Sequence, residues 1–310
     1  MIRLGGMAAP CALFILSACR GSDLSEAEAK ALSDRERRLA ERLASPDSDT
    51  IPLARWVLPR QLLEISGIAV TADGRLLAHN DEQSIVYVID PRRGVVLKHF
   101  TVGRKPMRGD FEGISVSGSE IFMLVSDGRI YRFREGGDGD NVPYATIDTR
   151  LGKACEFEGI AVDPSGVILL SCKNVAKTGP RNQLVIYRWD PRARQASVLG
   201  IPYASAIGSN GWKDLHPSDL AVDPATGNYV VIAAQEKALI VVTPGGQVVR
   251  SGPLPERSRQ AEGVAISRDG ILYVSDEGGT APATITLYRW PLPEVAADAY
   301  SPQVAQEPAP

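Results

Sequence analysis

The chain has 310 residues, of which 44% are hydrophobic and 23% are charged, so it can bury a large core in one or two domains and is not disordered over most of its length. Its 34 Lys and Arg nearly balance 37 Asp and Glu, and the formal net charge of -3 excludes the basic excess that binds a nucleic-acid backbone. With only three His, no Cys-x-x-Cys, no phosphate-binding glycine loop and no Gly-x-Ser-x-Gly elbow, the sequence argues against a zinc site and the commonest enzyme classes, and any metal should be oxygen-ligated.

The first segment has the features of an export signal. Arg3 stands in a short basic start, an apolar run follows, and the run ends in Leu16-Ser17-Ala18-Cys19. The run is shorter than the roughly 20 apolar residues that a membrane-spanning helix needs. The pattern resembles the lipobox of bacterial lipoproteins. The resemblance implies a signal peptide over residues 1–18, a lipid on Cys19, and a location in the bacterial cell envelope facing the periplasm, with inner or outer membrane left open.

The segment after Cys19 is predicted to be a spacer. Ser22 to Ser45 is rich in Glu, Ala, Arg and Leu but has only a sparse apolar stripe, which favours a solvated helix within a lipidated region of residues 19–50. At about 1.5 Å per residue, this helix would hold the next domain roughly 36 Å from the membrane. At the other end, residues 294–310 are rich in Ala and Pro and are predicted to be a disordered tail.

Between these flanks, residues 51–293 contain one pattern five times. Each copy has a short apolar strand, a turn such as Asp163-Pro164-Ser165-Gly166, and a second apolar strand. The copies align on Ile68, Ile114, Ile160, Leu220 and Val264. Their spacing is about 45 residues, and about 60 between the third and fourth copies, which suits four-stranded propeller blades.

A third strand follows in every copy, and a weaker fourth strand follows in the first four. The fifth copy has no fourth strand of its own, because Pro291 and Pro293 interrupt the chain there. Leu53 to Leu58 precedes the first copy and is predicted to supply this strand and close the ring. The expected fold is all-β: a five-bladed β-propeller of four-stranded antiparallel blades. A six-bladed propeller and a β-sandwich are the alternatives.

The repeats resemble the SdiA-regulated (YjiK/CarP) family of β-propellers. The resemblance rests on strands such as Glu156-Phe157-Glu158-Gly159-Ile160-Ala161-Val162-Asp163 and endings such as Ser275-Asp276-Glu277. It covers roughly residues 53 to 292 by repeat alignment. The fourth copy departs from it, with Asp219 where the others have glycine. The family implies a five-bladed, membrane-associated periplasmic propeller with a link to calcium, and it brings no assigned catalytic activity.

The residue before the glycine position should line one mouth of the central channel, because the first strand of a propeller blade is innermost. These residues are three Glu and two Ser: Ser66, Glu112, Glu158, Ser218 and Glu262. Converging carboxylates repel one another unless a proton, a basic neighbour or a cation relieves them. Calcium accepts several carboxylate, hydroxyl and water oxygens, so these five residues are its predicted ligands. The alternative is that each Glu caps backbone amides or pairs with Arg108, Lys153 or Arg259.

Further side chains are predicted to form the rim of this mouth. The ends of the second strands contribute mostly acidic residues: Asp81, Glu82, Asp127, Lys173, Glu236, Asp276 and Glu277. The extra residues before the fourth copy, Ala204 to Pro217, join an outer strand to the next inner strand on the same face. Trp212 and His216 could therefore form a lid, and a plain surface insertion is the alternative.

Cys155 and Cys172 flank the hairpin of the third copy and should lie diagonally on one sheet face. Export to an oxidising compartment favours a disulfide, whereas the diagonal placement leaves two free buried thiols equally open.

The function expected is that of a membrane-anchored periplasmic lipoprotein whose propeller binds calcium at the channel mouth and acts as a binding or interaction module in envelope or calcium homeostasis. Its expected partners are the membrane, through the Cys19 lipid, and an envelope protein, but no nucleic acid. No catalytic residue is assigned, and a non-enzymatic role is favoured. The alternatives are a metal-dependent hydrolase of the lactonase or phytase-like kind, and a structural scaffold without a metal.

Overall fold

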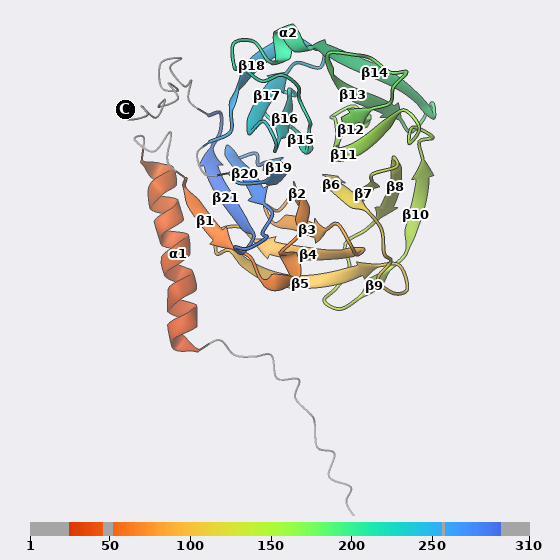
Figure 1. Cartoon of the computed structure of the whole chain (residues 1–310). Coiled ribbons are helices and arrows are strands. Elements are labelled where there is room, and N and C mark those ends of the chain that lie inside the picture. The colour runs from red at the N-terminus through yellow and green to blue at the C-terminus, as the bar shows by residue number, and fades with distance from the viewer. Residues whose placement is uncertain (1–24, 46–51, 256–257, 293–310) are drawn as a thin grey trace, which may run out of the picture.

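A computed structural model describes residues 25–45, 52–255 and 258–292. Five β-sheets surround a central axis as the blades of a propeller, and one long helix lies against its edge (Figure 1). Consecutive strands within each blade pair antiparallel, and the first strand of each repeat is the innermost. The predicted five-bladed propeller of four-stranded antiparallel blades is therefore confirmed, and the six-bladed and sandwich alternatives are wrong.

The first three blades follow the repeat in chain order. Blade 1 contains β2 (Ile65–Val70), β3 (Leu76–Asn80), β4 (Ile85–Asp90) and β5 (Val95–Val102). Blade 2 contains β6 (Phe111–Ser117), β7 (Glu120–Val125), β8 (Arg129–Phe133) and β10 (Tyr144–Asp148). Blade 3 contains β11 (Cys155–Val162), β12 (Ile168–Val175), β13 (Gln183–Asp190) and β14 (Gln195–Pro202). A short strand that was not predicted, β9 (Asn141–Val142), pairs in parallel with β5 and extends blade 1.

The last two blades differ in how they obtain their outer strand. Blade 4 contains β15 (Asp219–Val222), β16 (Tyr229–Ala233), β17 (Ala238–Val242) and β18 (Val248–Pro253). Blade 5 contains β19 (Ala261–Ile266), β20 (Ile271–Asp276) and β21 (Thr284–Arg289). Its outer strand is β1 (Ala54–Val57), which pairs antiparallel with β21 before the chain enters η1 (Arg60–Leu62) and blade 1. How much this pairing stabilises the ring stays a prediction.

Apolar side chains fill the space between neighbouring blades. A strand buried on both faces should be a continuous apolar run rather than an alternating one, and all five residues of β17 are apolar and buried. Between blades 5 and 1, large side chains that are at most 3% exposed pack together: Leu62, Ile68, Ile89, Tyr273 and Ile285. Burying apolar surface at about 25 cal/mol per Å² is the main stabilising contribution to such a fold.

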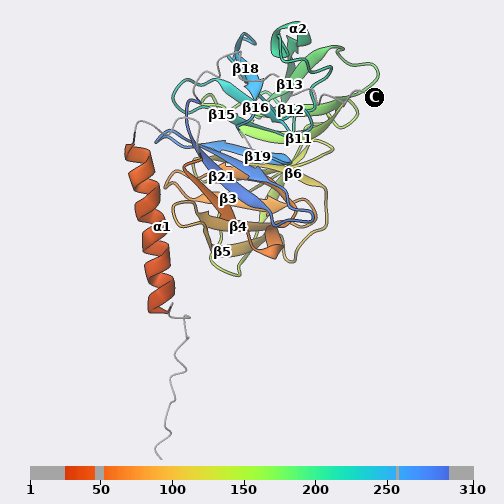
Figure 2. The same ribbon diagram turned by 60° about the vertical axis from the view of Figure 1, so that its left-hand side comes forward.

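The helix α1 (Glu26–Ala44) lies beside blades 5 and 1 (Figures 1 and 2). It begins at a capping box in which the Ser25 hydroxyl accepts from the Glu28 N–H and the Glu28 carboxylate accepts from the Ser25 N–H. Leu39 is buried in the apolar cluster of blades 5 and 1, and the Arg35 guanidinium lies 5.7 Å from the centroid of the Trp56 ring. The expected solvated spacer is therefore a docked helix, because its sparse stripe is sufficient to pack on the propeller edge.

The other described α-helix is the short α2 (Tyr203–Ala206), which lies in the insertion before blade 4. Neither described α-helix is long and apolar enough to span a membrane. The predicted signal peptide, Cys19 and the tail at residues 294–310 lie outside the described residues.

Candidate functional site

In four of the five blades, the residue before the glycine position of the repeat forms a β-bulge in the innermost strand. The pairing of β2 with β3 passes from Ile65 to Gly67 and leaves Ser66 without a cross-strand partner. Glu112, Glu158 and Glu262 are skipped in the same way in blades 2, 3 and 5. An extra residue in one strand bends that strand and re-aims the side chain. The repeated bulge is thus the local feature that gives these residues a common direction.

Ser66 and Ser218 use their hydroxyl groups to join neighbouring blades. The Ser66 hydroxyl donates to the Glu112 carbonyl oxygen at 3.1 Å, and the Ser218 hydroxyl donates to the Ala261 carbonyl oxygen at 2.6 Å. Both serines are buried. The first bond links the inner strands of blades 1 and 2, and the second links those of blades 4 and 5.

Glu112 and Glu158 meet at the boundary between blades 2 and 3, where their carboxyl groups share a hydrogen bond. Lys173 in β12 forms an ion pair with Glu158, with its Nζ 2.8 Å from Glu158 Oε1, and the Glu158 side chain is only 6% exposed. Burial, strengthened by the charge of Glu158, raises the pKa of Glu112 to about 9. A protonated Glu112 therefore donates to an ionised Glu158, whose charge Lys173 balances.

Glu262 belongs to the same electrostatic cluster. Burial raises its pKa to about 7, while a hydrogen bond from Gln260 opposes the shift. The Lys173 ammonium interacts with the charges of Glu158, Glu262 and Glu112. Lys173 is thus paired with Glu158, and the charges of the other two predicted glutamate ligands also act on its ammonium group.

Asp219 takes the place that glycine has in the other four blades. It is 1% exposed, and its carboxylate accepts the N–H of Leu220 at 2.8 Å and the N–H of Val264 in blade 5 at 2.8 Å. Burial raises its pKa well above the ordinary value, although both hydrogen bonds oppose the shift. Glycine at this position allows neighbouring inner strands to lie close together, because a Cβ atom on Gly159 would lie 2.6 Å from the Leu220 nitrogen.

Some of the predicted rim residues form a second acidic group. Burial raises the pKa of Asp81, and the charge of Glu64 adds to the shift. Burial likewise raises the pKa of Glu277, with Asp81 as the next cause. Glu82 is exposed. The charges of Asp81, Glu64 and Glu277 therefore act on one another, and their place at the rim of a binding site stays a prediction.

Two other predicted rim residues have structural partners. Asp127 forms an exposed ion pair with Arg129, at 2.7 Å between Oδ2 and Nε. Asp276 is buried and accepts the backbone N–H groups of Arg259 and Gln260. One oxygen of Asp276, Oδ1, thus holds the loop that enters β19.

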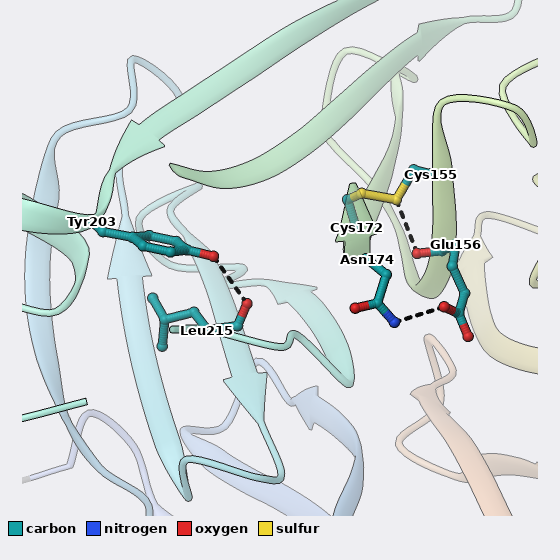
Figure 3. The surroundings of a disulfide bond; sticks show 6 residues. All are labelled: Cys155, Glu156, Cys172, Asn174, Tyr203 and Leu215. Atoms are coloured by element: carbon teal, nitrogen blue, oxygen red, sulfur yellow. Dashed lines mark hydrogen bonds between the residues drawn. A yellow bond between two sulfur atoms is a disulfide. The ribbon is translucent and has the colours of Figure 1, made fainter. Parts of the chain in front are cut away.

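The insertion before blade 4 is folded onto the propeller. The Tyr203 hydroxyl donates to the Leu215 carbonyl oxygen at 3.3 Å (Figure 3), and His216 Nδ1 lies 2.8 Å from Glu236 Oε1. Trp212 packs against the apolar cluster of blades 3 and 4. The indole is only partly buried, and its role in a lid stays a prediction.

Cys155 and Cys172 are joined by a disulfide, with their Cα atoms 5.8 Å apart (Figure 3). Cys172 faces Phe157 across the sheet, and the bulges on either side of Phe157 bring Cys155 within reach. The bond ties β11 to β12 directly beside Glu158 and Lys173.

Among residues 25–45, 52–255 and 258–292, no three His, Cys, Asp or Glu side chains already lie close enough together to hold a metal ion. The calcium site therefore stays a prediction. Its donors are all oxygens, which are the ligands of a hard cation, and the cluster does hold a cationic group in the Lys173 ammonium. Lys173 was predicted at the rim, but its bond to Glu158 was not predicted. The sequence holds one indication of this bond, because Lys173 is basic at a repeat position that is acidic in the first and fifth copies, at Asp81 and Glu277.

Comparison with known proteins agrees with this architecture. The family model described as SdiA-regulated matches residues 57–280, and no curated protein sequence matches the chain significantly. Among solved structures, the chain is similar to glutaminyl cyclase from Myxococcus xanthus, with a TM-score of 0.54, 12% identity, and coverage of 76% of this chain and 94% of that one. It is also similar to a luciferin-regenerating enzyme, with a TM-score of 0.50, 10% identity, and coverage of 78% and 97%. At such identities the similarity shows the fold alone.

Proposed function

The chain belongs to the SdiA-regulated family of β-propellers, and we propose that it is a cation-binding module of the bacterial envelope whose channel mouth binds calcium. It is anchored to the membrane through Cys19 and faces the periplasm. The observation that supports this proposal best is the repeated β-bulge, which puts Glu112, Glu158 and Glu262 at the same position of three inner strands.

The charges of the ring favour a divalent cation. Lys173 balances Glu158, and Glu112 retains a proton. Glu262 has a pKa of about 7, so it is partly ionised at neutral pH without a charge partner of its own. Binding of a divalent ion would displace the Glu112 proton, and the ion would then offset the charges of all three carboxylates at once. Calcium is preferred to magnesium, because side chains from separate blades suit a loose oxygen shell better than a tight octahedron.

The predicted ligands are the three glutamates, with Ser66, Ser218 or water supplying the remaining oxygens. When bound, calcium supplies positive charge at the mouth and links blades 2, 3 and 5. The acidic rim around Asp81 and Glu277 would then present a face whose charge depends on calcium, and this face is the proposed surface for an envelope protein partner.

Calorimetric titration of the purified, metal-stripped protein with calcium tests this proposal. We expect one calcium ion per chain, and no binding by a variant that combines Glu112→Gln, Glu158→Gln and Glu262→Gln. A control that combines Glu26→Gln, Glu36→Gln and Glu41→Gln removes the same charge from α1 and should bind calcium as the parent does. No binding heat with the parent protein would instead leave the ring as structural carboxylates.

A further inference from the structure

The outer strand of blade 3, β14, lies at the periphery of the propeller and has an open edge (Figure 1). The Tyr203 N–H, directly after this strand, donates to the Asn182 carbonyl oxygen, and the pairs with β13 alternate between bonded and non-bonded from that point. Ala196, Val198 and Gly200 therefore direct their N–H and C=O groups away from β13. All three residues are exposed, and no described residue forms a hydrogen bond with these outward groups.

Blade 1 covers the same groups of its own outer strand, β5. The Thr101 N–H donates to the Asp140 carbonyl oxygen at 2.8 Å. The His99 carbonyl oxygen accepts the Gly139 N–H, also at 2.8 Å, so β9 and the loop before it complete this edge. The outer strands of blades 2, 4 and 5 are shorter than β14, and each contains a charged residue, which discourages pairing with another strand: Asp148, Arg250 and Arg55.

The strand β14 has neither kind of protection. It has eight residues, none of them charged, and it pairs with β13 without a bulge. Val198 lies near the middle of the strand, and its side chain is 51% exposed. A long, regular and uncharged edge strand is a template for pairing with a further strand.

We propose that β14 pairs antiparallel with β14 of a second copy of this chain, so that two propellers join edge to edge. This proposal goes beyond the proposed function and does not depend on a bound cation. The outward groups determine the register, in which Val198 lies opposite Val198 of the copy and Ala196 lies opposite Gly200 of the copy. Every outward N–H of these three residues then donates to a carbonyl oxygen, and the two-fold symmetry closes the assembly at two chains.

The distribution of charge favours a second copy as the partner. Residues near a two-fold axis lie beside their own copies, so a charge in the middle of β14 would face a like charge, and β14 has no charge. The segments at the two ends of the strand carry opposite charges. Arg194 is exposed in the turn before β14, and Asp214 accepts the hydroxyl of Tyr203 directly after it. Antiparallel pairing brings these two segments of different copies together.

A short thiol cross-linker tests the register in cells that make the full chain. Opposite residues of a hydrogen-bonded antiparallel pair have Cα atoms about 5.5 Å apart, so Val198→Cys should yield a covalent dimer of this chain. Val249→Cys is the matched control, because Val249 is 58% exposed in the outer strand of blade 4. The control should give no dimer above the background of the parent, which has the same native cysteines. Equal dimer yields at the two positions would overturn the proposal.

Adding Ala196→Pro to the Val198→Cys chain tests the strand pairing itself. Proline removes an outward N–H but no hydrogen bond to β13, so the covalent dimer should be lost. An unchanged yield would overturn the proposal, because contacts other than strand pairing would then hold the copies together. A cross-linked product that contains a different protein would also overturn it and assign the edge to an extended segment of that protein. If Ala196→Pro does not fold, Gly200→Pro makes the same test.

Discussion

At the scale of single residues, the mouth of the channel depends on two neighbouring positions in four of the five inner strands. The side chain of the bulge residue lies outside the regular cross-strand positions. The glycine after it allows the inner strand of the next blade to pack closely against this one. At Gly159 the approach is close, because a Cβ atom would lie 2.6 Å from the Leu220 nitrogen and 2.7 Å from the Asp219 Cα. Any side chain there must push blades 3 and 4 apart.

We therefore predict that Gly159→Ala destabilises the propeller by about 1–3 kcal/mol, the usual cost of forcing an extra group into packed structure. Gly252→Ala in β18 is the matched control, because nothing lies within 4 Å of the position of its Cβ. Chemical denaturation of both variants measures the difference. Equal unfolding free energies for the two variants would show that the close contact of inner strands does not matter.

The raised pKa of Glu112 predicts how stability changes with pH. Its folded pKa of about 9 lies above its ordinary value of 4.5, so the folded protein holds this proton more tightly than the unfolded chain. The stability that comes from this protonation is complete below pH 4.5 and is lost as the pH rises through about 9. Glu112→Gln cannot ionise but still offers a donor to Glu158.

The metal-free parent should therefore melt at progressively lower temperature as the pH rises from about 5 to about 9, and Glu112→Gln should show a clearly smaller fall. Thermal melts across this pH range provide the measurement. Parallel pH profiles for the parent and the variant would contradict the assignment of the proton to Glu112.

The positions of the ring residues could be predicted from the sequence because the same bulge recurs in the repeats. Residues at the same position of the repeat therefore lie at equivalent places in their blades. The partner of Glu158 could not be predicted in this way. Lys173 reaches Glu158 from the neighbouring strand, and its side-chain direction depends on the disulfide and bulges beside it. Asp219 could be seen to depart from the pattern, but its bond to Val264 crosses to another blade, which a repeat alignment does not reveal.

At the scale of elements, the strands were predictable and the docking of α1 was not. A third strand was predicted in every copy, and β13 is that strand in blade 3, because apolar runs between turn residues mark a buried strand well. In α1 the sparse apolar stripe contains the buried Leu39, yet the stripe alone does not say what covers it. The sequence does not indicate that this stripe packs against the edge formed by blades 5 and 1.

The strand β1 yields a prediction for stability. A chain that begins at residue 59 lacks β1, Leu53 and Leu58, whereas a chain that begins at residue 52 keeps them, and both lack α1. The shorter chain should lose several kcal/mol, since β21 loses its partner and each lost buried leucine costs about 2–5 kcal/mol. Melting of the two fragments with the same midpoint and cooperativity would show that the ring does not depend on β1.

At the scale of the whole molecule, a docked helix stands between the propeller and the proposed membrane anchor at Cys19. A free helix of the 19 residues of α1 would separate them by roughly 29 Å. Because Leu39 and Arg35 pack against the propeller, α1 runs alongside the blades (Figure 2) and does not act as a free rod. The channel mouth would then take a defined orientation relative to the lipid, rather than sampling all orientations around a flexible tether.

The anchor itself is tested by Cys19→Ser. This change should move the protein from the membrane fraction to the soluble fraction and abolish fatty-acid labelling, because Cys19 is the residue that ends the lipobox-like sequence. Cys11→Ser, a change of the same type eight residues earlier, should leave the protein in the membrane. A Cys19→Ser protein that stays in the membrane and keeps its label would show that the anchor lies elsewhere.

The central claim is that the carboxylate ring binds calcium, and the melting temperature of the metal-stripped protein with and without calcium tests it most directly. A ligand that binds only the folded state at 100 times its dissociation constant adds about 2.7 kcal/mol of stability. Calcium should clearly raise the melting temperature of the parent. It should not raise that of the variant that combines Glu112→Gln, Glu158→Gln and Glu262→Gln. Identical melting temperatures of the parent with and without calcium would contradict it.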